Sequence, residues 1–299
     1  MNTNDFILVK NCPVCKILNT STDYEGIFFK NINFTIQKCD YCKISYTNPR
    51  IRKDKLKKLY TDEISMLEGG IEISSKIFKP LRVLSNKMFI NKIISMGVDI
   101  DKSDYILDFG TGEGVLVDAI SKSYPKVIGA DFIKVRELEF FISFHTLENN
   151  KKYKNIFKLI ILRHVLEHTH DPENFLQNIE KNYLKKGGYL ILEVPNYNSI
   201  YRNIFGKFFS LLTVPYHLFH FNTRSIELFI PRNLNIVNKG FFNSISLGTS
   251  ISNLFYKRFD GAVSLFSLFL FPFELCFDFF LKLTKREGKS LLLILQKRK

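Results

Sequence analysis

The stretch from residue 104 to residue 131 constrains the fold of this chain more than any other part. An apolar run ends at an aspartate, three alternating glycines follow, and an amphipathic segment leads to a second apolar run ending at another aspartate. In order, these are 105–107, Asp108, Gly110, Gly112, Gly114, 115–123, 127–130 and Asp131. The pattern predicts a strand, a glycine loop, a helix and a strand. Because glycine has no Cβ, such a loop can bring its N–H groups close to a ligand.

The spacing of the glycines indicates which ligand to expect. A dinucleotide fingerprint would place its third glycine three positions after the second. Here the segment reads D-x-G-x-G-x-G, and it resembles motif I of the class I S-adenosylmethionine (SAM) methyltransferases. The resemblance implies that Gly110, Gly112 and Gly114 hold the methionine end of SAM, with Asp108 nearby. Asp131 lies about 20 residues after the first glycine, where a carboxylate can bind ribose hydroxyls. NAD(P) binding and a vestigial nucleotide fold are the alternatives.

Four of the five cysteines form two CxxC pairs near the N-terminus, namely Cys12, Cys15, Cys39 and Cys42. Each pair can supply two thiolates from one tight turn, as a tetrahedral four-cysteine zinc site requires. Alternating apolar residues between the pairs predict a short hairpin at 24–38. We expect a structural zinc ribbon without catalytic chemistry, because four cysteine ligands leave no open coordination position. A redox dithiol and a site that has lost its metal are the alternatives.

The segment after the cysteines predicts a domain boundary and a helical connector. Asn48-Pro49-Arg50 marks the boundary, and a basic helix is predicted to begin at Asp54. A flexible break is expected at 66–70, followed by a long helix at 72–96 that is interrupted at Pro80. Ribbon, "TNPR" and tyrosine-ended helix resemble a bacterial group of methyltransferases with an N-terminal cysteine module. Many members of that group act in surface-polysaccharide or deoxysugar pathways.

The predicted domains are a zinc-ribbon module at 1–48, a helical connector at 49–100 and a SAM-dependent methyltransferase domain at 101–299. For the last of these, the resemblance implies an α/β, Rossmann-like sheet that is mostly parallel, with the last strand antiparallel. Apolar runs predict its later strands at 140–146, 159–163, 189–194, 234–247 and 290–298. A helix before the fifth strand is predicted to end at Gly187-Gly188, where glycine can form the cap.

Titratable residues follow the strand predicted at 159–163, in a stretch that reads HVLEH and then DP. This stretch resembles the post-strand motif of the same methyltransferase group, which implies that Arg163 and His164 line the methionine end of SAM. His164, Glu167 and His168 lie within about one helical turn, so their side chains can converge. Three interpretations compete: structural capping and packing, a general base, and a divalent metal site as in some quinone-type methyltransferases.

Another pair of histidines, His217 and His220, follows residues 197–216, where class I methyltransferases insert a substrate lid. The segment HLFHF resembles a stretch of sugar-modifying relatives that closes over the acceptor. Histidines that face a pocket can take a proton from a hydroxyl near neutral pH. The candidate catalytic bases are therefore His164, His168, His217 and His220. The alternative is that Asn222 or Thr223 caps a helix at 225–230 while the histidines only pack.

Composition limits the partners and the location. The 299 residues are 45% hydrophobic and 24% charged, which is typical of soluble globular proteins. The net charge of +14 is weak evidence for a nucleic-acid partner, because the lysines are spread along the chain. The first twelve residues have no basic region followed by a long apolar core, so no signal peptide is expected. With the cysteine usage, this predicts a reducing, cytoplasmic location.

An aromatic-rich segment at 262–283 is predicted to be helical. Its uncharged run, 262–273, is shorter than the roughly 20 residues that a membrane-spanning helix requires. A buried helix pair or a homodimer contact is the default interpretation, and peripheral contact with the inner membrane face is the alternative. Glu274 and Asp278 are expected to form an acidic face that argues against anionic lipid, and Cys276 to be a buried thiol.

The predicted function is therefore SAM-dependent methyl transfer to a small acceptor, with structural zinc in the ribbon. By resemblance, the expected acceptor is a nucleotide- or lipid-linked sugar in cell-surface glycan assembly. An RNA methyltransferase is one alternative, and it would require a contiguous basic face. A non-catalytic SAM-fold scaffold at a membrane surface is the other, and it would not bind SAM.

Overall fold

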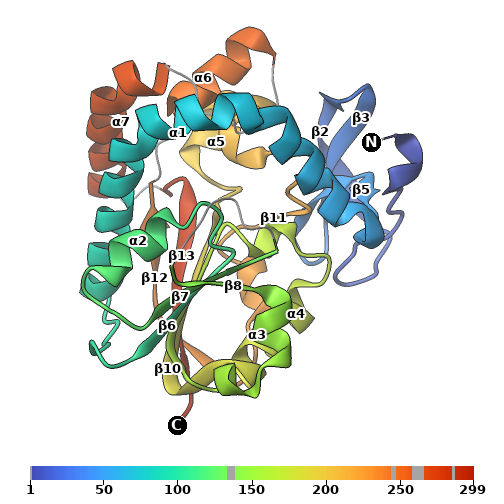
Figure 1. Cartoon of the computed structure of the whole chain (residues 1–299). Helices are drawn as coiled ribbons and strands as arrows, with labels where there is room; N and C mark the ends of the chain where they lie inside the picture. The colour runs from blue at the N-terminus through green and yellow to red at the C-terminus, as the bar shows by residue number, and fades with distance from the viewer. Residues whose placement is uncertain (1, 133–138, 244–246, 258–265, 285–286) are drawn as a thin grey trace.

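The centre of the molecule is a twisted sheet of seven strands in the order β12-β13-β10-β9-β6-β7-β8 (Figure 1). The computed structural model describes residues 2–132, 139–243, 247–257, 266–284 and 287–299, leaving out the side chains of 62–79, 266–268 and 282. The strands of the sheet are β6 (Tyr105–Phe109), β7 (Val127–Asp131), β8 (Phe141–Ser143), β9 (Phe157–Arg163), β10 (Leu184–Pro195), β12 (Leu234–Phe242) and β13 (Ser290–Lys297).

The pairing of these strands confirms the predicted fold class. Neighbouring strands from β10 to β8 are parallel, and β13 is antiparallel to both of its neighbours. The chain starts at β6 in the middle, moves outward to β8 and returns to β9 on the other side of β6. This reversal is a topological switch point, and ligands of open α/β sheets bind beside it, outside the carboxyl ends of the strands.

Helices cover both faces of the sheet because its buried strands are apolar on both sides. Along β9, Leu159 and Ile161 belong to one buried core, and Ile160 and Leu162 belong to the other. The first core includes residues of α1 (Leu56–Ser95) and α2 (Val115–Ser121). The second core includes residues of α3 (Phe144–Asn149) and α4 (Pro172–Asn182). The result is a three-layer α/β domain.

The N-terminal region forms a smaller sheet in the order β11-β4-β3-β2. Its strands are β2 (Thr20–Phe29), β3 (Ile32–Cys39), β4 (Ser45–Asn48) and β11 (Phe219–His220), while β1 (Phe6–Ile7) pairs with β5 (Arg50–Ile51). The antiparallel pair of β2 and β3 confirms the predicted hairpin and extends it at both ends. Because β11 is distant in sequence from the other three strands, this sheet is completed by the HLFHF segment, which follows the predicted lid at 197–216.

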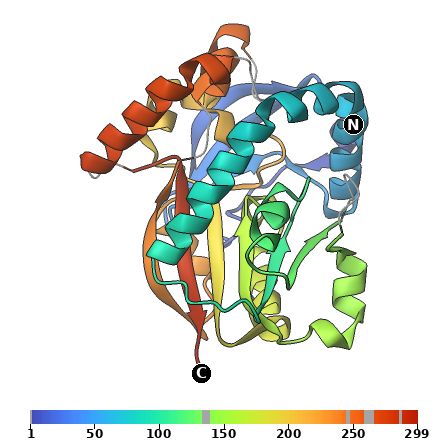
Figure 2. The same ribbon diagram turned by 60° about the vertical axis from the view of Figure 1, so that its left-hand side comes forward.

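The connector is one helix, α1, and the predicted break at 66–70 and interruption at Pro80 are wrong. A proline inside a helix removes one backbone hydrogen bond, which packing of the rest of the helix can offset. Phe89 and Ile93 of its C-terminal half are buried against the sheet. Figures 1 and 2 show α1 running from the N-terminal sheet, over the top of the molecule, to the flank of the central sheet.

Three further boundaries differ from the predictions. The third strand, β8, is short, because Ser143 caps α3 by accepting a hydrogen bond from the Thr146 N–H. The helix predicted to end at Gly187-Gly188 ends at Asn182, and both glycines lie in β10 at an irregularity of its pairing with β9. A Cβ at Gly188 would lie 2.8 Å from the carbonyl oxygen of Lys185, so this bulge needs glycine. Finally, β12 ends at Phe242, α6 begins at Leu247, and residues 244–246 lie outside the described part.

The aromatic-rich segment forms α7 (Phe266–Leu283), which packs beside α6 (Leu247–Tyr256), while residues 262–265 lie outside the described part. The expected acidic face is wrong, because Glu274 and Asp278 point inward and form ion pairs with the buried Lys289. Cys276 is exposed rather than buried. In the described part of the chain, no helix has both the length and the apolar character needed to cross a membrane.

The remaining helices are short. They are α5 (Ile200–Phe205), η1 (Thr3–Asp5), η2 (Lys53–Lys55), η3 (Lys151–Tyr153), η4 (Leu166–His168), η5 (Gly206–Phe208), η6 (Ser210–Leu212) and η7 (Ser225–Phe229). The η elements are 3-10 helices, and η7 replaces the α-helix predicted at 225–230.

Candidate functional site

The glycine loop between β6 and α2 has a backbone that other residues adopt only with strain. Gly110, Gly112 and Gly114 have φ angles of +80°, +53° and +71°. A Cβ at Gly110 would lie 2.5 Å from Cγ2 of Val165, which follows β9, so the two loops touch. A Cβ at Gly112 would meet no described atom within 4 Å. Glycine is therefore required at Gly110 by packing and at the other two positions by backbone conformation.

The two aspartates of the motif lie on either side of this loop. Asp131, at the end of β7, accepts hydrogen bonds from the Gly112 N–H at 2.8 Å and from the Phe132 N–H at 2.6 Å. Asp108 is buried and accepts a hydrogen bond from the Thr111 hydroxyl at 2.8 Å. Burial raises the pKa of Asp108 to about 6, against the opposing effect of Thr111. The structure thus brings both predicted carboxylates to the same bend.

An aromatic group beside Asp131 was not predicted from the sequence. The Phe132 side chain is 73% exposed, and its ring meets Phe144 edge-on at 4.3 Å between centroids. Phe144 stacks in turn on Phe109 at 4.2 Å. An exposed aromatic ring directly after the ribose-type carboxylate offers a flat apolar surface for a nucleobase. Its position next to Asp131 in the sequence was a signal that could have identified it.

Arg163 and His164, at the end of β9, belong to a buried network of charges. The Arg163 guanidinium donates to Glu193 at 2.5 Å and to Asn86 of α1 at 2.8 Å, and it lies over the Phe89 ring. The His164 ring lies 3.2 Å from Glu167 and 3.4 Å from Glu193. Burial lowers the pKa of His164, but the two carboxylates outweigh it and raise the pKa to about 10. His164 is therefore an imidazolium at neutral pH and cannot serve as a base there.

A second cluster of side chains forms where the loop after β9 meets the HLFHF segment that follows the predicted lid. One ligand atom each from Glu167, His168 and His217 lies within 4.8 Å of the others, which would allow a metal ion to bind. The two imidazole rings meet edge-on at 4.6 Å between centroids. Burial lowers the pKa of His168, and it holds the pKa of His217 well below its usual value. Both rings are therefore unprotonated at neutral pH.

His220 does not join this cluster. Its Nε2 lies 3.0 Å from the Thr47 hydroxyl of β4, and that hydroxyl donates to the carbonyl oxygen of His217 at 2.6 Å. His220 is 2% exposed and belongs to β11, which pairs with β4 of the N-terminal sheet. Asn222 accepts hydrogen bonds from the N–H groups of Arg224 and Ser225 at the start of η7, but the N-cap residue of η7 is Arg224, so neither Asn222 nor Thr223 is the predicted cap.

The buried histidines should make the fold acid-sensitive. Burial lowers the pKa of His220 to about 3, with a smaller contribution from Arg202, whereas histidine in the unfolded chain titrates near 6.5. The stabilisation from a neutral His220 is therefore present above about pH 6.5 and is lost as the pH falls toward 3. Between pH 7.5 and pH 5, the free energy of unfolding, measured with urea, should fall by about 2 kcal/mol less for His220→Gln than for the wild type. His145→Gln, at an exposed histidine, is the control. An equal fall in the free energy of unfolding between pH 7.5 and pH 5 for His220→Gln and His145→Gln would contradict the prediction.

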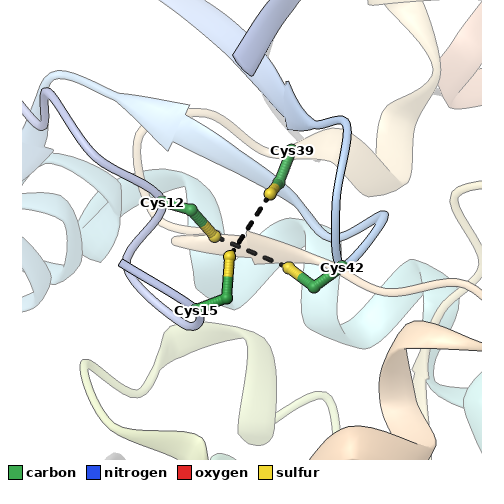
Figure 3. A group of neighbouring side chains, drawn as sticks. All are labelled: Cys12, Cys15, Cys39 and Cys42. Atoms are coloured by element: carbon green, nitrogen blue, oxygen red, sulfur yellow. Dashed lines mark hydrogen bonds between the residues drawn. The ribbon is translucent and has the colours of Figure 1, made fainter. Parts of the chain in front are cut away.

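The four N-terminal cysteines point at a common centre (Figure 3). The Sγ atoms of Cys12 and Cys42 lie 3.6 Å apart, and those of Cys15 and Cys39 lie 3.5 Å apart. Four thiolates bound tetrahedrally to zinc would be about 3.8 Å apart, so the cluster fits this ion.

The two turns that carry the cysteines have matching backbone hydrogen bonds. In the first turn, the Cys12 N–H donates to the carbonyl oxygen of Ile17, and the Lys16 N–H donates to that of Cys12. In the second turn, the Cys39 N–H donates to the carbonyl oxygen of Ile44, and the Lys43 N–H donates to that of Cys39. Equivalent turns present their thiols in equivalent directions. The local sequence spacing therefore produces paired turns that are compatible with a zinc ribbon.

Comparison with known proteins places the central domain in a family. A family model described as a methyltransferase domain matches residues 85–237, just over half of the chain. A search of curated proteins finds no match.

Solved structures with a similar fold include two that are described as SAM-dependent methyltransferases. A SAM-dependent methyltransferase from Archaeoglobus fulgidus is 17% identical, with a TM-score of 0.44, and the match covers 76% of this chain and 100% of that one. A SAM-dependent methyltransferase from Thermotoga maritima, described as a possible histamine N-methyltransferase, is 16% identical, with a TM-score of 0.47 and coverage of 79% and 100%. At such low identities and scores, these likenesses carry no conclusion about the acceptor.

Proposed function

We propose, from the premise that this chain belongs to the methyltransferase-domain family and is a class I SAM-dependent methyltransferase, that it methylates a hydroxyl of a nucleotide- or lipid-linked sugar. The observation that carries the SAM site is the contact between Asp131 and the Gly112 N–H at the switch point of the sheet. This hydrogen bond joins the carboxylate that is proposed to bind ribose to the glycine loop. At Gly112 of that loop a Cβ would meet no described atom within 4 Å. In this proposal the loop amides face the methionine end of SAM, Asp131 binds the ribose, and Phe132 packs on the adenine.

The charges around this loop suit a zwitterionic amino-acid group next to a sulfonium. Asp108 and Asp131 lie at the ends of β6 and β7, and Arg163 and His164, which form ion pairs with Glu193 and Glu167, lie at the end of β9. SAM, when bound, supplies an electrophilic methyl group. The protein's contribution is to hold the acceptor in line with it, because alignment supplies much of the acceleration of such a displacement.

The acceptor site is proposed at Glu167, His168 and His217. Val165, which touches Gly110, lies two residues before Glu167, so this cluster adjoins the glycine loop. Of the four histidines predicted as bases, His164 is protonated and His220 forms a hydrogen bond with Thr47 of the smaller sheet. His168 and His217 are therefore the two histidines that remain available to interact with the acceptor hydroxyl. The resemblance of the ribbon, "TNPR" and HLFHF segments to sugar-modifying relatives supports a carbohydrate acceptor.

The test is SAM turnover against nucleotide sugars and cell-envelope extracts, with mass detection of a gain of one methyl group. Asp131→Ala should weaken SAM binding about tenfold or more, because a hydrogen bond to a charged group is lost. Asp99→Ala, an exposed aspartate before β6, is the matched control. Calorimetry should show normal SAM affinity for that control. Absence of SAM binding by the wild type would overturn the proposed function, and methyl gain only on RNA would overturn the proposed acceptor.

A further inference from the structure

One carboxylate oxygen of Glu167 is buried and has no hydrogen-bond partner in the described part of the chain. The side chain is completely buried, and its Oε1 lies 3.2 Å from the His164 ring. Its Oε2 has no hydrogen-bond partner among the described residues. A buried carboxylate oxygen without a partner carries a large desolvation cost. Such an oxygen indicates that a ligand with positive charge completes its surroundings.

The two histidines beside Glu167 are oriented in the way that metal ligands commonly are. Nδ1 of His217 lies 2.9 Å from the carbonyl oxygen of Leu211, and Nδ1 of His168 lies 3.1 Å from that of Tyr216. A carbonyl oxygen can only accept, so Nδ1 of His217 carries the proton and its Nε2 keeps its lone pair. Nδ1 of His168 also lies 2.6 Å from the Tyr60 hydroxyl, and its Nε2 keeps the lone pair when that hydroxyl accepts. Histidine ligands of metals typically donate their other N–H to a backbone carbonyl in this way.

The three ligand groups are held together by contacts among three separate elements. The Leu218 N–H donates to the carbonyl oxygen of Glu167 at 2.7 Å, which connects the HLFHF segment to the loop after β9. The Tyr60 hydroxyl of α1 lies 2.6 Å from Nδ1 of His168. Nε2 of His217 is 3.9 Å from Oε1 of Glu167, whereas ligands about 2.1 Å from a tetrahedral ion would be about 3.4 Å apart. Small side-chain rotations would therefore complete the site.

We propose that Glu167, His168 and His217 bind a divalent transition-metal ion that holds the acceptor hydroxyl for methyl transfer. Two nitrogen ligands and one carboxylate suit such an ion and leave coordination positions open. An open position can take a hydroxyl oxygen and lower its pKa. The hydroxyl proton then passes to water while its oxygen bonds to the methyl carbon. The carbon–sulfur bond breaks with its electron pair on sulfur, which leaves S-adenosylhomocysteine. The role of the ion in catalysis rests on the proposed function, whereas the binding site itself does not.

The experiment is a titration of the full-length protein, loaded with one equivalent of zinc, with Mn²⁺ in the presence and absence of SAM. Mn²⁺ is the probe because thiolates favour zinc, so it does not compete for the cysteine cluster. Electron paramagnetic resonance and calorimetry should show one bound Mn²⁺ per chain. Glu167→Gln and His217→Gln should each weaken this binding by at least about tenfold. His145→Gln, at an exposed histidine of α3, should bind Mn²⁺ as the wild type does.

SAM affinity, measured on the same samples, reports whether each variant is folded and separates the two proposals. Wild-type protein that binds SAM but not Mn²⁺ would overturn the metal site and leave the proposed methyl transfer standing. Mn²⁺ binding that is unchanged in both Glu167→Gln and His217→Gln would place the ion elsewhere and would also overturn it. Protein that binds Mn²⁺ at this cluster but not SAM would support the metal site and refute the proposed function alone.

Discussion

Gly110→Ala is expected to weaken SAM binding by about tenfold or more, because its Cβ displaces loop N–H groups that would hydrogen-bond a charged group of SAM. A Cβ at this position would lie 2.5 Å from Cγ2 of Val165, which is closer than two carbon atoms can approach. The φ angle of +80° adds strain for any residue with a side chain. The loop must therefore shift, and its N–H groups move away from the methionine end of SAM. Isothermal titration with SAM measures the loss.

Gly97→Ala provides a matched control for this substitution. Gly97 has a φ angle of +98°, but its Cβ would meet no described atom within 4 Å. The Gly97→Ala substitution therefore introduces backbone strain of about 1 to 2 kcal/mol without a steric clash. We expect a lower free energy of unfolding for Gly97→Ala and an unchanged SAM affinity. Equal SAM affinities for Gly110→Ala and the wild type would show that the loop does not seat the cofactor as proposed.

Loss of one cysteine of the N-terminal cluster is expected to lower the melting temperature by roughly 10 °C or more. In Cys39→Ser a thiolate ligand is replaced by a hydroxyl, so a structural zinc ion would bind poorly. The cluster joins the turns before β2 and after β3, and β4 of the same sheet pairs with β11. Methyl transfer should therefore fall with the melting temperature, because β11 follows His217. SAM affinity should change little, since the glycine loop belongs to the central sheet.

Cys276→Ser is the control for the cysteine substitution, because Cys276 is exposed on α7 and distant in sequence from the two CxxC pairs. It should retain the zinc content and the melting temperature of the wild type. Zinc analysis and thermal unfolding measure both quantities. A Cys39→Ser variant that kept one zinc per chain and the wild-type melting temperature would contradict the structural role of the metal.

Features that depend on local spacing could be predicted from the sequence. The glycine loop, its flanking strands and the carboxylate at Asp131 lie within 28 residues, from 104 to 131, and the structure has each of them. The two CxxC turns are equally local, and their thiols converge once the β2–β3 hairpin forms. Backbone conformation and strand pairing over short distances determine these features, so residue type and spacing were sufficient.

Features that depend on pairs distant in sequence could not be predicted in this way. The sequence showed four candidate bases, but Glu193 joins the nearby Glu167 in making His164 an imidazolium, and Thr47 of β4 forms a hydrogen bond with His220 of β11. The same dependence explains Glu274, which looked like part of an exposed acidic face until Lys289 was found to pair with it. Protonation state is determined by burial and by neighbouring charge, and both come from tertiary contacts. The sequence alone therefore determined the fold and the predicted cofactor loop, whereas the tertiary structure decided which side chains remain available for chemistry.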